Sequence, residues 1–286
     1  MNTWVIARNT LGDALRKRVL LVFLLLAMVM LLLALMLQYF TAREQMVTFK
    51  STELAIILIF GALIAITTSI FLIPSEIEKR TIYSVLSKPV QRWEFFLGKF
   101  LGGVLTAAVT LGLMTVVLMI VVFILSARPA SSPGDIMGAT NQAASVNPRE
   151  WLSTGFREVA LVLQGCYVIM FELVLITAIA TTLSLWFSPT VNFSITAFIF
   201  VTGSLQDVMA AWTRRNDLPL TKMLANGFYY ITPHFEDFNI VGHIVHPEVA
   251  LKMSPIAYAL EVSLYGVVYG LMILLIGVLV FDKKEV

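Results

Sequence analysis

The sequence of 286 residues is poor in charge, cysteine and histidine. Asp, Glu, Lys and Arg make up 13% of it, about half of the usual share of roughly 25%, which is too little to cover the surface of a soluble domain. The single cysteine, Cys166, excludes a disulfide within the chain. Three histidines leave little room for a histidine-rich metal site. A net charge of +2 excludes the strong basic field that attracts nucleic acid, so we expect no nucleic-acid partner.

The apolar residues, 58% of the chain, lie in long runs with few charges. A helix needs about 20 residues to cross about 30 Å of hydrocarbon, and lipid offers no water to an unpaired peptide group. The sequence therefore predicts an all-α integral membrane protein, a single domain over residues 1–286 embedded in the lipid bilayer. The runs predict six transmembrane helices, at about 19–40, 54–75, 98–126, 159–187, 190–211 and 256–281.

The distribution of basic residues predicts the orientation of these helices. Six crossings leave both termini on one side, and the short segments of that side carry eleven of the 20 Lys and Arg residues. The other nine are spread over longer loops. Because positive charge in short loops marks the cytoplasmic face, we expect both termini in the cytoplasm and residues 212–255 in a long outer loop.

The N-terminal arm, residues 1–18, is too charged to cross the membrane. Its helical pattern has Trp4, Leu11 and Leu15 on one face, and an Arg-Lys-Arg cluster ends it. This pattern favours an amphipathic helix that lies in the headgroup plane. The alternative is a segment that only determines topology.

A charged loop joins the second and third predicted spans. Glu76 and Arg80 are four residues apart, so an ion pair can support a helical turn there. A short helix follows, which ends before Pro89. Its small apolar face consists of Ile82, Val85 and Leu86. An apolar knob between charges is suited to docking into a groove of a cytoplasmic partner; the alternative is an ordinary solvated loop.

This loop resembles the first cytoplasmic loop of type-2 ABC exporter permeases. The residues that match the family's pattern there are Glu78, Thr81, Leu86, Ser87, Pro89, Arg92, Phe95, Gly98 and Lys99. Arg80 stands where the family usually has glycine. The order of arm, six spans, long last outer loop and basic tail extends the resemblance over the whole chain, and it includes the permeases of copper-enzyme maturation systems.

The resemblance implies a permease subunit of an ABC exporter in the plasma (inner) membrane. Two permeases would pair as a homodimer or close heterodimer along the first and fifth spans, and separate ATPase subunits would bind beneath them. The stretch from Arg80 to Ser87 would be the coupling helix, and the Ser188-Pro189 turn a minor second contact. The implied ATPase-coupling residues are Glu76, Glu78, Arg80, Thr81, Ile82, Val85, Leu86, Ser87, Pro89, Ser188 and Pro189.

Nucleotide chemistry in this chain is not expected. A phosphate-binding loop needs Gly-x-x-x-x-Gly-Lys-Ser/Thr, but Gly98-Lys99 is followed by Phe100 and position 93 is Trp. We therefore expect no cofactor here and no enzyme activity, with ATP and Mg²⁺ held by the partner ATPase.

Glu172 lies near the middle of the fourth predicted span. A charge at that depth is costly, and no Lys or Arg lies inside a predicted span beyond Lys99 at the start of the third. We therefore expect the Glu172 carboxyl to be protonated, or to be hydrogen-bonded to hydroxyls such as those of Thr67, Thr68 or Thr177. One interpretation is a polar patch on the substrate path or a conformational latch; the other is a hydrogen bond between helices.

Two smaller groups of residues complete the candidates. His234, His243 and His246 lie in the long outer loop and have the chemistry of metal ligands, but loop histidines are commonly only solvated, so we expect no metal site. Two glycine pairs, Gly98 with Gly102 and Gly266 with Gly270, predict close helix packing.

Two other functions remain open at this point. One is a membrane-embedded enzyme that uses Glu172. The other is an ABC mechanotransmitter, which would act on a periplasmic accessory protein without transporting anything.

Overall fold

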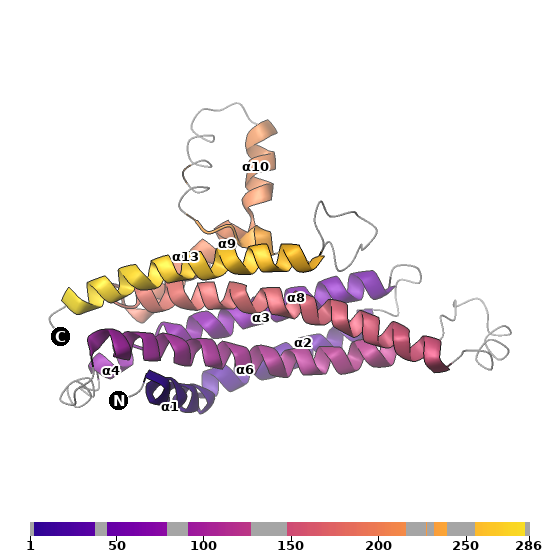
Figure 1. The fold of residues 1–286 in the computed structure, drawn as a ribbon, viewed down its shortest axis with the longest axis horizontal. Coiled ribbons are helices and arrows are strands. Elements are labelled where there is room, and N and C mark those ends of the chain that lie inside the picture. The colour runs from indigo at the N-terminus through magenta and orange to yellow at the C-terminus, as the bar shows by residue number, and fades with distance from the viewer. Residues whose placement is uncertain are drawn as a thin grey trace.

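The computed structural model describes residues 3–37, 45–78, 91–126, 148–215, 227, 232–238 and 255–283, and no strand occurs among them. The helices are α1 (Thr3–Leu15), α2 (Arg18–Leu37), α3 (Gln45–Ser69), α4 (Pro74–Glu78), α6 (Arg92–Ser126), α8 (Pro148–Leu183), α9 (Pro189–Ser204), α10 (Gln206–Arg215) and α13 (Pro255–Lys283), with a 3₁₀ turn η2 (Phe235–Phe238). The long helices form an elongated bundle, and both termini lie at the same end of it (Figure 1).

Five of these helices are long and apolar enough to cross a membrane: α2, α3, α6, α8 and α13. The chain is therefore a multi-pass helical membrane protein. The remaining predicted crossing, the fifth at 190–211, falls on α9, which has 16 residues and so a length of about 24 Å at 1.5 Å per residue. Because α9 is shorter than the hydrocarbon layer of about 30 Å, the count of six stays a prediction.

Two membrane helices begin well before their apolar runs. The sequence predicts the second span from residue 54 and the fourth from residue 159, whereas α3 begins at Gln45 and α8 at Pro148. The extensions bring charges together, because Lys50 Nζ on α3 lies 2.6 Å from Glu158 Oε2 on α8. This ion pair stabilises the two extensions, so both helices continue beyond their apolar runs.

The fifth predicted span, residues 190–211, is divided into α9 and α10 at Leu205. Figure 1 shows α10 pointing away from the long axis of the bundle. The break coincides with a packing contact: a Cβ on Gly203 would lie 2.4 Å from the Phe235 ring. On α10, Gln206 Nε2 donates to Thr232 Oγ1 over 2.8 Å. These contacts from the segment before α13 hold the chain at the break.

The 3₁₀ turn η2 packs onto the bundle, although the sequence predicts an outer loop throughout 212–255. Phe235 and Phe238 are buried, and η2 packs against α8 and α9. Phe238 also lies against Gly266 of α13, where an added Cβ would be 3.0 Å from its ring. Asp237 is exposed, so the turn is held on the bundle by its two phenylalanine side chains.

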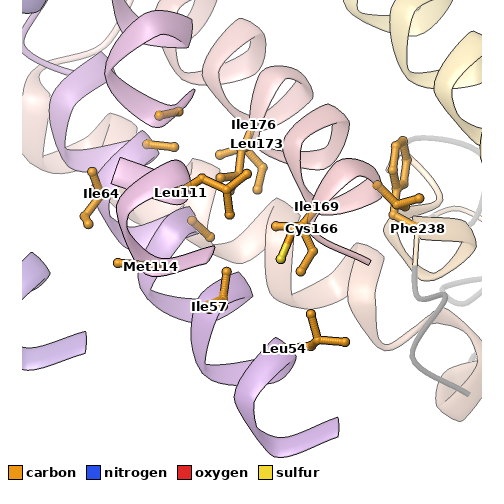
Figure 2. Close-up of a cluster of buried hydrophobic side chains, with 14 of the residues drawn as sticks. Leu54, Ile57, Ile64, Leu111, Met114, Cys166, Ile169, Leu173, Ile176 and Phe238 are labelled. Atoms are coloured by element: carbon orange, nitrogen blue, oxygen red, sulfur yellow. The ribbon is translucent and has the colours of Figure 1, made fainter. Parts of the chain in front are cut away.

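The core consists of two clusters of apolar side chains. The larger one lies mainly where α3, α6 and α8 meet, as Figure 2 shows for Ile57, Met114 and Ile169. Gly61 of α3 lets Leu173 of α8 approach closely. The second cluster lies at the end that carries the termini and joins α1, α6, α8 and α13. Helix α6 contacts α1, α3, α8 and α13, so it is the central element of the bundle.

Candidate coupling end of the bundle

The end of the bundle that carries both termini is where the sequence predicts contact with an ATPase. It contains α1, α4, the first turns of α6, the turn after α8 and the end of α13 (Figure 1). Buried side chains from α1, the turn before α4, α6, α8 and the turn after it, and α13 form the second core cluster: Ile6, Leu72, Ile73, Phe95, Phe96, Phe100, Ala178, Leu185, Leu274 and Phe281. Because one apolar cluster joins these elements, a displacement of one is transmitted to the others through packed side chains.

An ion pair ties α4 to α6 on either side of the predicted coupling segment. Lys99 Nζ lies 2.7 Å from Glu76 Oε1, and the two side chains are 8% and 22% exposed. The ammonium also lies 5.6 Å from the centre of the Phe95 ring. Pro74 opens α4 and Glu76 lies in its first turn, an arrangement that suits a helix N-terminus.

Most of the predicted ATPase contacts lie in the stretch of sequence between α4 and α6. Residues 79–90, with Arg80, Thr81, Ile82, Val85, Leu86, Ser87 and Pro89, fall outside the described residues, as does the Glu78 side chain. The sequence suggests Arg80 as the partner of Glu76, and the structure adds Lys99. Residues 79–90 therefore connect two helices, α4 and α6, that are joined by a partly buried ion pair.

Helix α1 packs directly on the start of α6 through two glycines. A Cβ on Gly98 would lie 2.8 Å from Ile6 Cβ, and one on Gly102 would lie 2.4 Å from Thr10 Cβ. The Thr10 hydroxyl donates to the carbonyl of Ile6 over 2.8 Å, so it needs no partner on α6. Gly98 and Gly102 thus form the surface of α6 on which α1 packs, next to Lys99.

The opposite face of α1 is turned outward. Trp4 is 62% exposed and Leu15 is 36% exposed, while Ile6, Ala7 and Thr10 are buried. The apolar face that the sequence indicated is therefore free to lie on lipid, and a second face holds the helix to the bundle. A location in the headgroup plane stays a prediction.

The end of α13 packs against the start of α6 in the same region. The Phe281 ring lies 6.1 Å from the rings of Phe95 and Phe96. Arg92 Nη1 donates to the carbonyl of Asp282 over 3.2 Å. A Cβ on Gly277 would lie 2.5 Å from the Phe96 ring, so this glycine allows the contact. The start of α6 is thereby held from one side by α1 and from another by α13.

The Ser188-Pro189 turn, the predicted minor contact, begins α9. Pro189 occupies the first turn of α9, and the Ser188 carbonyl accepts the N–H of Asn192 over 2.9 Å. Asn192 Nδ2 donates to the carbonyl of Ala180 on α8 over 2.9 Å. Sequence reasoning missed Asn192; an amide early in an apolar run, directly after a Ser-Pro turn, is the signal that could have identified it.

Glu172 is buried on α8, with 2% of its surface exposed. The expected hydrogen bonds to threonine are not formed. The Thr67 and Thr68 hydroxyls donate to the carbonyls of Leu63 and Ile64 in their own helix. The Thr177 hydroxyl has no hydrogen-bond partner among the described residues. A threonine in a helix readily donates to the carbonyl four residues before it, which explains two of the three mispredictions.

The structure describes one of the three candidate histidines, His234, and both glycines of the predicted packing pair on α13. The backbone N–H of His234 donates to the Tyr265 hydroxyl over 3.1 Å, and the His234 ring lies beside the Tyr265 ring. His243 and His246 lie outside the described residues. Within the described ranges, no group of three or more His, Cys, Asp or Glu residues could hold a metal ion. Gly266 faces Phe238, whereas no described atom lies within 4 Å of a Cβ on Gly270, so helix packing at Gly270 stays a prediction.

Sequence reasoning also missed the charges at the opposite end of the bundle. Lys50 and Glu158 both lie outside the predicted spans, yet they join α3 to α8. Glu53, one turn after Lys50, is 1% exposed, and its two oxygens have no hydrogen-bond partner among the described residues. Opposite charges beside two spans on the same side of the membrane are the signal that could have suggested the pair.

A comparison with protein families gives a match over nearly the whole chain. The family model described as ABC-2 family transporter protein matches residues 4–286. No curated protein matches the sequence.

Proposed function

Because this chain belongs to the ABC-2 transporter family, we propose that it is the membrane subunit of an ABC exporter, driven by a separate cytoplasmic ATPase. Membership makes the chain a multi-pass permease component of an ABC transporter. It also favours transport over catalysis by this chain. The family match over residues 4–286 is the observation that carries the proposal.

The ATPase would bind at the end of the bundle that holds α1 and α4. The coupling helix of the proposal is the stretch from Arg80 to Ser87, and the Ser188-Pro189 turn is the minor contact. Two features support this location: the Glu76–Lys99 ion pair at the base of 79–90, and the packing of α1 on Gly98 and Gly102. A force applied to 79–90 would reach α6 through that ion pair and would pass to α1 and α13 through the second core cluster.

The proposed mechanism assigns mechanical roles to this chain. ATP and Mg²⁺ would be held by the ATPase subunits, because this sequence has no phosphate-binding loop. Closure of the ATPase pair would move the coupling helix, and the membrane helices would shift between two arrangements.

The orientation in the proposal has both termini in the cytoplasm and the chain in the plasma (inner) membrane. Both termini lie at one end of the bundle, as an even number of crossings requires (Figure 1). That end also carries Arg8, Arg16, Lys17, Arg18 and Arg92. The density of basic residues supports a cytoplasmic location.

We further propose that two permeases pair along α2 and α9, as a homodimer or a close heterodimer. Large apolar side chains point outward along these elements in the single chain. On α9 and α10 they are Val191, Phe198, Val201, Leu205, Val208 and Trp212. Roles for a periplasmic accessory protein and for copper-enzyme maturation remain hypotheses from the sequence.

Co-purification with the ATPase subunit tests the proposal. The tagged wild-type complex is compared with Val85→Asp, which adds a charge to the apolar face of the coupling helix, and with Val286→Asp as a matched control in the C-terminal tail. We expect the wild type and the control to retain an ATPase subunit and its activity, and Val85→Asp to lose the subunit or its coupling. Absence of any ATPase from the mildly solubilised wild type would contradict the proposal.

A further inference from the structure

A cavity of about 800 Å³ lies between α6, α8 and α13, away from the coupling end. Its walls come from residues 108–119 of α6, 160–170 of α8 and 256–260 at the start of α13. A volume of this size is within the range of roughly 300–1,000 Å³ that is typical of sites for small ligands. The cavity is open on one side, so it is a groove in the surface of the bundle and not an enclosed void.

The cavity opens sideways, toward the position of the lipid. Leu163, Val116 and Leu260 line it and are each about half exposed or more, at 52%, 49% and 60%. All three lie within candidate membrane spans. The medium outside the opening is therefore hydrocarbon, and an occupant that enters from the side is a molecule dissolved in the bilayer.

One buried polar group inside the cavity has only a weak partner. Thr115 is 6% exposed and lines the cavity, and its Oγ1 makes no well-aligned hydrogen bond within the described part of the chain. On the same helix, Thr106 and Thr110 donate to the carbonyls four residues before them. Thr115 is left with the thiol of Cys166, and sulfur is a weak hydrogen-bonding group. A buried hydroxyl without a strong partner costs free energy, which a ligand with an oxygen acceptor would recover.

Two further polar groups lie on the α8 wall. Gln164 and Tyr167 line the cavity, and the Tyr167 hydroxyl accepts a hydrogen bond from Ser263 over 3.3 Å. The rest of the lining is almost entirely apolar. Apolar walls with a few placed polar groups are the usual composition of a specific ligand site.

The depth of Thr115 suits the polar end of a lipid tail. It lies about 10 Å to the outer side of the midpoint of the candidate span Arg92–Leu125, at 1.5 Å per residue. With a hydrocarbon layer of about 30 Å, this is close to the boundary where the acyl chains join the headgroups.

We propose that this cavity binds a phospholipid of the outer leaflet by one acyl chain, and that the Thr115 hydroxyl donates to the ester carbonyl of that chain. The site is separate from the proposed ATPase contact. The assignment to the outer leaflet rests on the proposed orientation with both termini in the cytoplasm, whereas the binding itself requires only that the chain lies in a bilayer.

Photolabelling in a reconstituted complex tests this site. The probe is a phospholipid that carries a diazirine in its acyl chain, and labelled peptides are mapped by mass spectrometry. Gly112 is exposed, lines the cavity, and has no described atom within 4 Å of an added Cβ, so the Phe side chain of Gly112→Phe begins without a clash and extends along the cavity. Ile120→Phe is the control, because Ile120 lies on the same helix, is 55% exposed and does not line the cavity.

We expect the wild type and Ile120→Phe to be labelled at residues 108–119 and 160–170 in excess over the exposed side chains Leu271, Leu275 and Leu279 of α13, which lie outside both the cavity and the proposed permease pairing. Gly112→Phe should lower that labelling about tenfold, equivalent to about 1.4 kcal/mol. Equal labelling of these α13 positions and of the cavity walls in the wild type would mean ordinary surface lipid and would overturn the proposal. Unchanged labelling in a folded Gly112→Phe would overturn it as well.

Thr115→Val separates a binding role from a structural one. The substitution keeps the shape of the side chain and removes the hydroxyl. We expect probe retention to fall about fivefold, the value of one net hydrogen bond, while the melting temperature in lipid-free detergent stays the same or rises. A lower melting temperature with unchanged labelling would assign Thr115 a purely structural role and contradict the proposed contact.

Discussion

Lys99 Nζ lies 2.7 Å from Glu76 Oε1, and this contact joins two helices that the sequence separates by the whole predicted coupling segment. Both side chains are mostly shielded from water, at 8% and 22% exposed. Lys99 of this pair is next to Gly98 and one turn from Gly102, the two glycines of α6 on which α1 packs. The end of the bundle is therefore built so that α1, α4 and α6 are held together where the ATPase is proposed to bind.

Removal of one partner of this ion pair is expected to destabilise the permease and to weaken coupling. Lys99→Met leaves the Glu76 carboxylate partly buried without its counter-ion. A cost of about 2 kcal/mol, between those of exposed and buried pairs, is expected as a lower melting temperature in detergent. Transport should fall more than ATP hydrolysis in the reconstituted complex.

The charge-reversed pair Glu76→Lys with Lys99→Glu is the control for that experiment. It should recover part of the melting temperature that either single substitution loses, since the attraction between opposite charges is kept. If the reversed pair is no more stable than Lys99→Met, the contribution of the ion pair itself is negligible.

A methyl group at Gly102 is expected to displace α1 from α6. The new Cβ would lie 2.4 Å from Thr10 Cβ and 3.0 Å from the carbonyl oxygen of Ala7, so Gly102→Ala forces the helices apart. Overpacking of this kind typically costs about 1–3 kcal/mol, which a melting curve detects. Gly112→Ala on the same helix meets no described atom within 4 Å and should not lower the melting temperature.

A second substitution distinguishes this clash from a general effect of the glycine. Thr10→Gly removes the side chain that Gly102→Ala would strike. The double variant should be more stable than Gly102→Ala alone. A double variant that melts lower than both single variants would show that α1 does not dock as described.

Loss of the Lys50–Glu158 ion pair is expected to loosen the outer end of the bundle. Glu158→Gln keeps the size of the side chain but leaves the Lys50 ammonium, on a residue only 4% exposed, without its counter-charge. We expect a loss of about 2 kcal/mol, read as faster hydrogen exchange at the start of α3 and α8. Glu261→Gln, at an exposed position of α13, is the control and should leave exchange unchanged.

Cysteine cross-linking tests the proposed pairing of two permeases. In a Cys166→Ala background, Phe198→Cys places a single thiol on the outward face of α9, where Phe198 is 55% exposed. A disulfide-linked dimer is expected in native membranes after mild oxidation. Ile120→Cys, equally exposed on α6, is the control and should remain monomeric on a denaturing gel. Cross-linking at Ile120 but not at Phe198 would contradict pairing through α9.

The local properties of the sequence determined the class of the protein and the location of its long helices. Apolar runs of about 20 residues require helices in a bilayer whatever their neighbours are. The cores of α2, α3, α6, α8 and α13 therefore follow from composition alone. Likewise, Ser188-Pro189 predicts a helix start from backbone chemistry, and α9 begins there.

Only the tertiary structure decided which residues meet. Lys99 and Glu76, or Lys50 and Glu158, are far apart in sequence, and no periodicity relates them. The division of 190–211 into α9 and α10 depends on Phe235 packing on Gly203, a contact between segments that local pattern cannot connect. Helix formation depends on hydrogen bonds within one segment, whereas ion pairs, helix breaks and cavities depend on the shape of neighbouring segments, which is decided when the bundle packs.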